Sequence, residues 1–104
     1  YTIELAKMIL YLITTEKYGI YHGTCQGKTS WYDFANKIFE AAGISQKVTA
    51  VTTKEYGSKT KRPAYSVLAN NRLAERPLCA WEGALDEYLA SDCMKAWLAE
   101  NEIL

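Results

Sequence analysis

Residues 19–43 read GIYHGTCQGKTSWYDFANKIFEAAG, and the rest of the chain is organised around this stretch. Its first part contains β-branched and aromatic residues between Gly19 and Gly23, a pattern that predicts a short strand. A polar loop with a further glycine, Gly27, follows this strand. The stretch therefore predicts a strand and a glycine-flanked loop that lead into a helix.

The helix in this stretch has its own start and stop signals. Ser30 is a good N-cap residue, and Asp33 follows three residues later, so that the pair can satisfy free amides of the first turn. Gly43 suits the left-handed position that ends a helix. Apolar residues recur between them at helical spacing, which predicts one continuous apolar face made of Trp31, Phe34, Ala35, Ile38, Phe39 and Ala42.

A second helix is predicted before this stretch, with Thr2 as its cap and its end near Thr14 or Thr15. Its apolar residues leave almost no polar face: Ile3, Leu5, Ala6, Met8, Ile9, Leu10, Leu12 and Ile13. A helix that is apolar nearly all round is normally buried on more than one side. We therefore expect a covering partner for this helix and, because the first residue is not methionine, a longer parent protein.

The segments after the central helix complete an α/β pattern. Residues 48–52 (VTAVT) show the β-branched alternation of a second strand, which we expect to pair in parallel with the first because a helix lies between them. One helical turn is predicted at 53–56 and a brief helix at 71–75. A last amphipathic helix begins at Trp81 and breaks at Ser91. The predicted fold is α/β, with about four helices and a short parallel two-stranded sheet.

The composition excludes several classes of protein. The 104 residues suffice for one domain, and the 12 basic and 12 acidic side chains cancel, which argues against nucleic-acid and membrane-surface binding. The longest apolar run, residues 8–13, is too short to span a bilayer. Three cysteines without paired spacing favour free thiols in a reducing compartment, so we expect a cytoplasmic protein, and a structural zinc site is not expected.

The loop between Gly23 and Lys28 invites comparison with nucleotide-binding loops. A P-loop needs four residues between its glycines and this loop has three, and no glycine set fits the dinucleotide pattern Gly-x-Gly-x-x-Gly. None of the eight tyrosines is followed four residues later by lysine, the pair that short-chain dehydrogenases use. His22 has no nucleophile and carboxylate around it and is interpreted as a structural residue. The sequence therefore assigns no catalytic, cofactor-binding or metal-binding residue.

One basic run remains as a candidate binding site. Residues 59–63 read KTKRP, in a part of the chain where basic residues outnumber acidic ones. An arginine beside a rigid proline, such as Arg62 beside Pro63, can offer a fixed fork of donors to a phosphate. The run predicts an anion site, and a solvated loop is the alternative interpretation.

Five segments, read together, point to a family. They are YTIELA at 1–6, GIYH at 19–22, SWYDFA at 30–35, RPAYSVL at 62–68 and WEGAL at 81–85. In this order and spacing they closely resemble the C-terminal third of dTDP-4-dehydrorhamnose reductases, which are extended short-chain dehydrogenases/reductases. The resemblance extends to about residue 89, and residues 91–104 lie outside it.

The resemblance implies a parent enzyme that reduces the 4-keto group of dTDP-4-dehydro-L-rhamnose with NADPH or NADH. In this family an N-terminal Rossmann domain carries the cofactor loop and the catalytic residues, so the chain by itself is expected to bind no cofactor. Residues 1–104 are expected to form one substrate-binding lobe. Within it, residues 1–25 border the missing Rossmann domain and 30–104 form the small lobe that closes over the nucleotide-sugar.

The resemblance also implies a role for the basic run. In related extended reductases the arginine of an Arg-Pro pair contacts the diphosphate of the sugar nucleotide, and Arg62 matches that position. Lys61 and Tyr65 are its expected neighbours at the substrate.

Two alternatives stay open at this point. The chain resembles in part the lobes of other nucleotide-sugar reductases and epimerases. It also fits a non-enzymatic interaction module that docks through its apolar first helix. A lobe of an enzyme should either self-associate through Ile3 to Ile13 or regain function when the Rossmann half is supplied.

Overall fold

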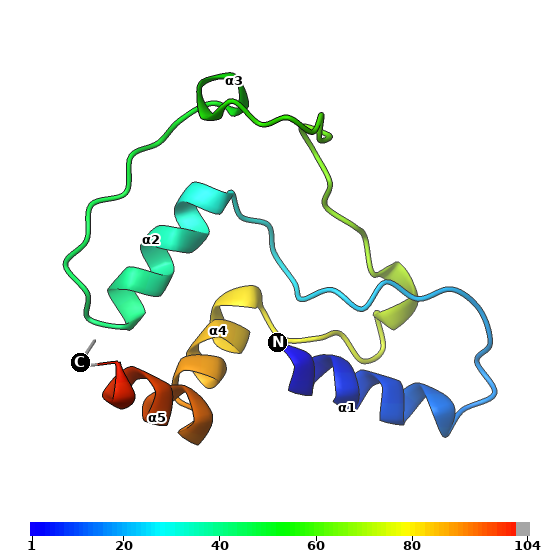
Figure 1. The fold of residues 1–104 in the computed structure, drawn as a ribbon. Coiled ribbons are helices and arrows are strands. Elements are labelled where there is room, and N and C mark those ends of the chain that lie inside the picture. Colours follow the sequence, from blue (N-terminus) through cyan, green and yellow to red (C-terminus); the bar gives the residue numbers. More distant parts are fainter. Residues whose placement is uncertain (102–104) are drawn as a thin grey trace.

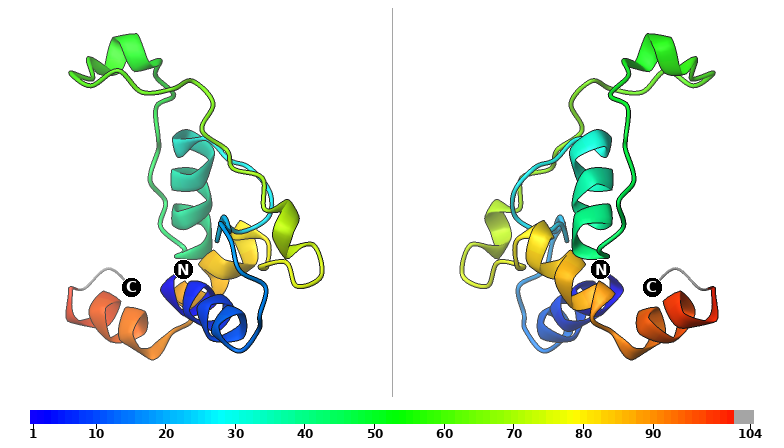
Figure 2. Two further views of the ribbon diagram at one scale, coloured as in Figure 1. Left: turned by 90° about the vertical axis from the view of Figure 1, so that its right-hand side faces the viewer. Right: turned by 90° about the vertical axis from the view of Figure 1, so that its left-hand side faces the viewer.

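The computed structural model describes residues 1–101, and long extended segments join its helices (Figure 1). α4 lies at the centre of a helical cluster, in contact with both α2 and α5. The segments on either side of α3 form a wide arch over this cluster (Figures 1 and 2). The elements of the described part are α1 (Thr2–Ile13), α2 (Trp31–Ala41), α3 (Thr53–Tyr56), the 3-10 helix η1 (Asn71–Leu73), α4 (Trp81–Leu89) and α5 (Asp92–Glu100).

Both predicted ends of the central helix, α2, are confirmed. The Ser30 hydroxyl accepts a hydrogen bond of 3.0 Å from the amide of Asp33, as an N-cap does. At the other end Gly43 has a φ of +68°, and its amide donates to the Glu40 carbonyl at 3.1 Å. The Ile44 amide donates to the Phe39 carbonyl at 2.9 Å, which completes a Schellman motif.

The other helix predictions are largely confirmed. α3 is the expected single turn, with Thr52 and Glu55 in a reciprocal capping box. Ser91 caps α5 by accepting from the Met94 amide, so the last amphipathic pattern breaks where expected. One detail was wrong: Thr2 is already helical, and Tyr1, which flanks α1, makes no side-chain cap.

The predicted two-stranded sheet is not found in residues 1–101. The segments 20–24 and 48–52 are extended but do not pair, because 48–52 runs along the arch while 20–24 lies against α1 and the segment before η1 (Figure 1). Instead, a single parallel bridge joins Gln26 to Ala80. Alternating residues predict an extended segment, but a strand also needs a partner whose peptide groups lie alongside it.

We call this bridge, with its neighbours 25–27 and 79–81, the bridge joint. The Gln26 amide donates to the Cys79 carbonyl at 2.9 Å, and the Trp81 amide donates to the Gln26 carbonyl at 3.1 Å. Trp81 also packs edge-on against Phe34 of α2, with ring centroids 5.6 Å apart. The bridge joint therefore fixes the start of α4 against the loop that precedes α2.

The core of the described chain is small. Its radius of gyration is 16.8 Å, whereas a compact domain of this length has about 13 Å. The accessible surface is 8555 Å², compared with about 5,900 Å² for a compact protein of this mass. The buried apolar side chains are Leu73, Leu78, Ala84, Leu85 and Leu98. Much of the apolar surface of the arch and of α1 therefore faces outward.

α1 shows this exposure most clearly, because none of its 12 residues is buried. Leu10 and Ile13 keep 61% and 71% of their surface accessible. One edge of α1 packs on residues 23–25, where Leu5 and Met8 approach Gly23 so closely that a Cβ there would lie 2.8 Å from each. No helix within residues 1–101 is both long and apolar enough to cross a membrane.

Three Gly→Ala substitutions distinguish the effect of backbone strain on the free energy of unfolding from the effect of side-chain packing. We predict that Gly83→Ala raises the free energy of unfolding by up to about 1 kcal/mol, because Gly83 lies inside α4 with open space around it. Gly43→Ala should lower it by roughly 1 kcal/mol through strain alone, since its φ is positive and its surroundings are open. Gly27→Ala should lower it further, because its φ is +86° and the new Cβ would lie 3.0 Å from Trp81.

Urea unfolding followed by tryptophan fluorescence measures all three variants. Equal losses for Gly27→Ala and Gly43→Ala would contradict the prediction, because they would show that Trp81 accommodates the new Cβ at residue 27 without cost.

Candidate functional site

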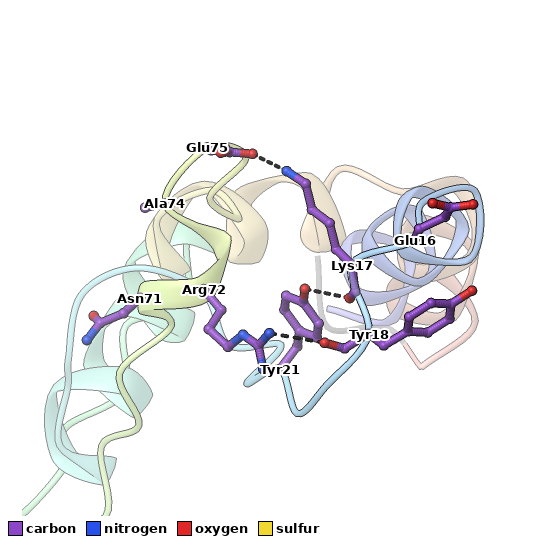
Figure 3. Close-up of a pocket in the computed structure, with 8 residues that line it drawn as sticks. All are labelled: Glu16, Lys17, Tyr18, Tyr21, Asn71, Arg72, Ala74 and Glu75. Carbon is purple, nitrogen blue, oxygen red and sulfur yellow. Dashed lines mark hydrogen bonds and ion pairs between the residues drawn. The ribbon is translucent and has the colours of Figure 1, made fainter.

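A cavity of about 570 Å³ opens where η1 faces the segment that follows α1 (Figure 3). It is a wide surface depression that is open to solvent. Charged and aromatic side chains from two distant parts of the chain meet in its wall. The lining consists of Glu16, Lys17, Tyr18, Tyr21, Asn71, Arg72, Ala74 and Glu75.

Two anchors hold η1 at this position. Leu73 is buried, with 3% of its surface accessible, and fixes the inner side of the turn in the core. The side-chain amide of Asn70 donates a hydrogen bond of 2.9 Å to the Thr24 carbonyl. With Leu73 directed inward, the neighbouring Arg72 is directed toward residues 18–21 and the cavity (Figure 3).

Arg72 is held over an aromatic ring. Its Nη2 donates to the Tyr18 carbonyl at 3.1 Å, and its Cζ lies 4.8 Å from the centroid of the Tyr21 ring. The Tyr21 hydroxyl donates to the Lys17 carbonyl at 2.7 Å, which fixes the ring. Gly19 leaves the room for this stack, since a Cβ there would lie 2.1 Å from Arg72 Nη1, and its φ is +138°.

An exposed ion pair between Lys17 and Glu75 borders the same cavity. The hydrogen bond to Lys17, and then its charge, hold the pKa of the Glu75 carboxyl below its usual value. The same contact raises the pKa of Lys17. These two charges neutralise each other, whereas Glu16 and Arg72 form no ion pair within residues 1–101.

A second cavity of about 250 Å³ lies on the other side of Arg72 and shares Asn71 and Arg72 with the first. His22 is in its wall, and His22 Nδ1 lies 2.9 Å from the Ala69 carbonyl oxygen, to which it donates. This contact agrees with the interpretation of His22 as a hydrogen-bonded structural residue.

The structure places the predicted site residues elsewhere. Arg62, Lys61 and Tyr65 lie on the arch between α3 and η1; all three are exposed and none of them lines either cavity. Within residues 1–101 none of them forms an ion pair or a side-chain hydrogen bond. They lie together on one loop and apart from Arg72.

Sequence reasoning missed the stack of Arg72 on Tyr21. Tyr21 was interpreted as a strand residue and Arg72 as part of a brief helix, and no spacing rule links residues so far apart in the chain. Gly19 itself is the one local signal, because a glycine permits another side chain to approach the backbone closely.

The arrangement is suited to binding an anion or a polar ring. Arg72 has five N–H donors, of which one meets a protein acceptor in the described part of the chain. A guanidinium with further donors can bind phosphate or carboxylate through two parallel bonds. No cluster of three metal-ligating side chains occurs within residues 1–101.

The glycine loop does not fit the phosphates of a dinucleotide. The Gln26 amide is already bonded to Cys79, and the Trp81 side chain covers Gly27. The first amide that the Ser30 cap serves, that of Asp33, is likewise bonded. These backbone groups are therefore committed to contacts within the chain.

Comparisons with known proteins give a consistent result. Residues 1–94 match the family described as the RmlD substrate binding domain. The chain is 44% identical over 91 residues to a spore coat polysaccharide biosynthesis protein of Bacillus subtilis, and this match covers 86% of the chain and 32% of that protein.

Two solved structures are similar to it as well. A dTDP-4-dehydrorhamnose reductase of Clostridium acetobutylicum has a TM-score of 0.79 at 44% identity, over 85% of this chain and 32% of that one. A dTDP-4-dehydrorhamnose reductase of Bacillus anthracis, solved in complex with NADP, has a TM-score of 0.76 at 36% identity, over 86% and 32%. The chain thus spans about a third of the length of these relatives.

The ion pair at the cavity can be tested by titration. We predict that Lys17→Met raises the pKa of Glu75 toward its ordinary value, because the hydrogen bond and charge that lower it are removed. Carboxyl-detected NMR titration measures this shift. Glu55 is the control, since the backbone amide and hydroxyl of Thr52 lower its pKa and the substitution leaves them in place. If the pKa of Glu75 is the same in Lys17→Met and in the wild type, the ion pair between Lys17 and Glu75 does not persist in solution.

Proposed function

Because the chain belongs to the RmlD substrate binding domain family, we propose that it is the nucleotide-sugar-binding part of an NAD(P)H-dependent dTDP-4-dehydrorhamnose reductase. The observation that carries this proposal is the family match over residues 1–94, which includes both the arch and the cavity walls. The likeness to two solved reductases over about 85% of the chain supports it. In the proposed reaction a hydride reduces the 4-keto group of dTDP-4-dehydro-L-rhamnose.

The proposal assigns the reduced nicotinamide cofactor, NADPH or NADH, to residues outside this chain. The hydrogen bond from the Gln26 amide to Cys79 and the Trp81 side chain beside Gly27 support this division, since both oppose the close approach of a pyrophosphate to this loop. Catalytic proton donation is also assigned to the remainder of the enzyme. This chain would supply substrate contacts and orientation, and the free thiols of its three cysteines support a reducing, cytoplasmic location.

Arg62 is the proposed contact to the diphosphate of the sugar nucleotide, with Lys61 and Tyr65 as its neighbours. Their exposure on one loop supports this role, because their polar groups meet no protein partner in the described residues. Pro63 restricts the backbone next to Arg62, which limits the entropy lost when the guanidinium binds. The arch would bring this loop to the substrate.

The exposed apolar face of α1 is the proposed contact with the rest of the reductase. Ile9, Leu10 and Ile13 are each about half exposed or more, as expected of side chains that a second surface covers in the complete protein. The unpaired segments 20–24 and 48–52 would complete the α/β fold by pairing with strands outside this chain. In isolation, this face would promote association of the chain with itself.

We predict that Arg62→Ala in the complete reductase weakens binding of dTDP roughly 10- to 100-fold. This is the effect of losing a hydrogen bond to a charged group, worth about 1.5–3 kcal/mol. Arg62→Lys should recover only part of the affinity, because lysine keeps the charge and loses the planar fork. Isothermal titration calorimetry with dTDP measures both variants.

Lys54→Ala is the matched control, since Lys54 is an exposed basic residue on α3, at the apex of the same arch. Unchanged dTDP affinity in Arg62→Ala would remove Arg62 from the site. Equal losses in Arg62→Ala and Lys54→Ala would indicate a general effect of charge.

The role of α1 predicts the behaviour of the isolated chain. We expect the 104-residue chain to self-associate, and we expect Ile9→Lys with Ile13→Lys to shift it toward the monomer in sedimentation velocity. Leu68→Lys is the control, because Leu68 is an apolar residue outside α1 with 51% of its surface exposed. A wild-type chain that sediments as a monomer at high concentration would contradict this prediction.

A further inference from the structure

Cys25 and Cys79 lie beside each other at the bridge joint, and the proposed reductase function uses neither. Gln26 and Ala80 form the parallel bridge, and each cysteine immediately precedes one of these two residues. In a parallel pair, residues at matching register lie on one face, about 4.8 Å apart. The two thiols therefore face the same side of the bridge joint, although they are distant in sequence.

We propose that Cys25 and Cys79 form a redox-sensitive dithiol, which a low-molecular-weight disulfide converts into an intramolecular disulfide across the bridge joint. A Cα separation of about 4.8 Å falls inside the range of about 4.4–6.8 Å that disulfides require. Both thiols are free and half-buried, so that an oxidant can reach them.

The surroundings of Cys79 support this pairing and affect how readily its thiol reacts. Partial burial, and then the neighbouring Cys25 and the carboxylate of Glu4, raise the pKa of the Cys79 thiol. A thiol with a raised pKa is less often present as the reactive thiolate near neutral pH. A first attack by Cys25 and a second by Cys79 agrees with this raised pKa, and the reverse order gives the same disulfide.

The reaction is two successive thiol–disulfide exchanges. The Cys25 thiolate attacks one sulfur of the oxidant, whose S–S bond breaks, and the released thiolate takes up the proton that Cys25 lost. The Cys79 thiolate then attacks the Cys25 sulfur of the mixed disulfide and displaces the second small thiolate, which takes up the proton from Cys79. Two protein thiols are oxidised to one disulfide, and one small disulfide is reduced to two thiols.

The disulfide would add a covalent link to the bridge joint. The bridge joint is held by two backbone hydrogen bonds, and the chain between Cys25 and Cys79 includes α2, the arch and η1. Closing this long loop restricts the unfolded chain and so raises stability. Cys93 is exposed on α5 and is not part of the bridge joint, which makes it the internal control.

The test uses the wild-type protein, first reduced and then incubated with oxidised glutathione under native conditions. After free thiols are alkylated, digestion and mass spectrometry without reductant should find one peptide pair joined through Cys25 and Cys79. The melting temperature of the oxidised protein should exceed that of the reduced protein by at least about 5 °C. Dithiothreitol should reverse both changes.

Cys93→Ser should leave the link and the shift in melting temperature unchanged. Cys25→Ser and Cys79→Ser should abolish both, and the remaining thiol should carry a glutathione adduct. The proposal is overturned if wild-type Cys25 and Cys79 appear only as separate adducts, if either links to Cys93, or if the link forms without a change in melting temperature. Because these three outcomes are measured on wild-type protein, a variant that fails to fold does not affect them.

Discussion

The two hydrogen bonds that join Gln26 to Cys79 and Trp81 are the constraint on which the rest of the structure depends. They are the long-range backbone hydrogen bonds of residues 1–101, since the other backbone bonds outside helices connect neighbours in sequence. Trp81 extends this contact to Phe34 and so sets α4 against α2. Without the bridge joint, the described helices would share little beyond a core of five buried side chains.

The extended segment 18–27, which ends at the bridge joint, connects α1 to η1 and to the residues before η1. Successive carbonyls and side chains along it contact Arg72, Ala69 and Asn70, and its glycines admit side chains from α1 and η1. A second stack, of Arg76 on Tyr11 with 4.6 Å between Cζ and the ring centroid, secures the end of α1. Arginine–tyrosine stacks and single hydrogen bonds thus hold the elements together, whereas in a compact domain packed layers of helices and sheets do so. This explains why α1 and the arch keep exposed apolar surface.

Single hydrogen bonds and one arginine–tyrosine stack also hold the candidate site. The cavity beside Arg72 has fixed walls, because Tyr21 is hydrogen bonded and Gly19 leaves room for the guanidinium. Within residues 1–101 the side chain of Arg62 makes no hydrogen bond or ion pair, and its loop belongs to the arch. The cavity and the exposed basic loop are therefore built from two different parts of the chain. The free thiols at the bridge joint lie outside both.

The sequence by itself determined both ends of α2 and the family. Ser30 and Gly43 bound α2 because a cap and a left-handed glycine act on backbone groups within a few residues, and the family match over residues 1–94 agrees with the resemblance of five short segments. Only the tertiary structure decided that Gln26 pairs with Ala80, that 48–52 stays unpaired, and that Trp31, predicted on the apolar face of α2, is 83% exposed. The physical reason is range: caps and periodicity depend on neighbours within a turn, whereas a strand partner or a cation–π contact depends on segments that the fold brings together from far apart in the chain.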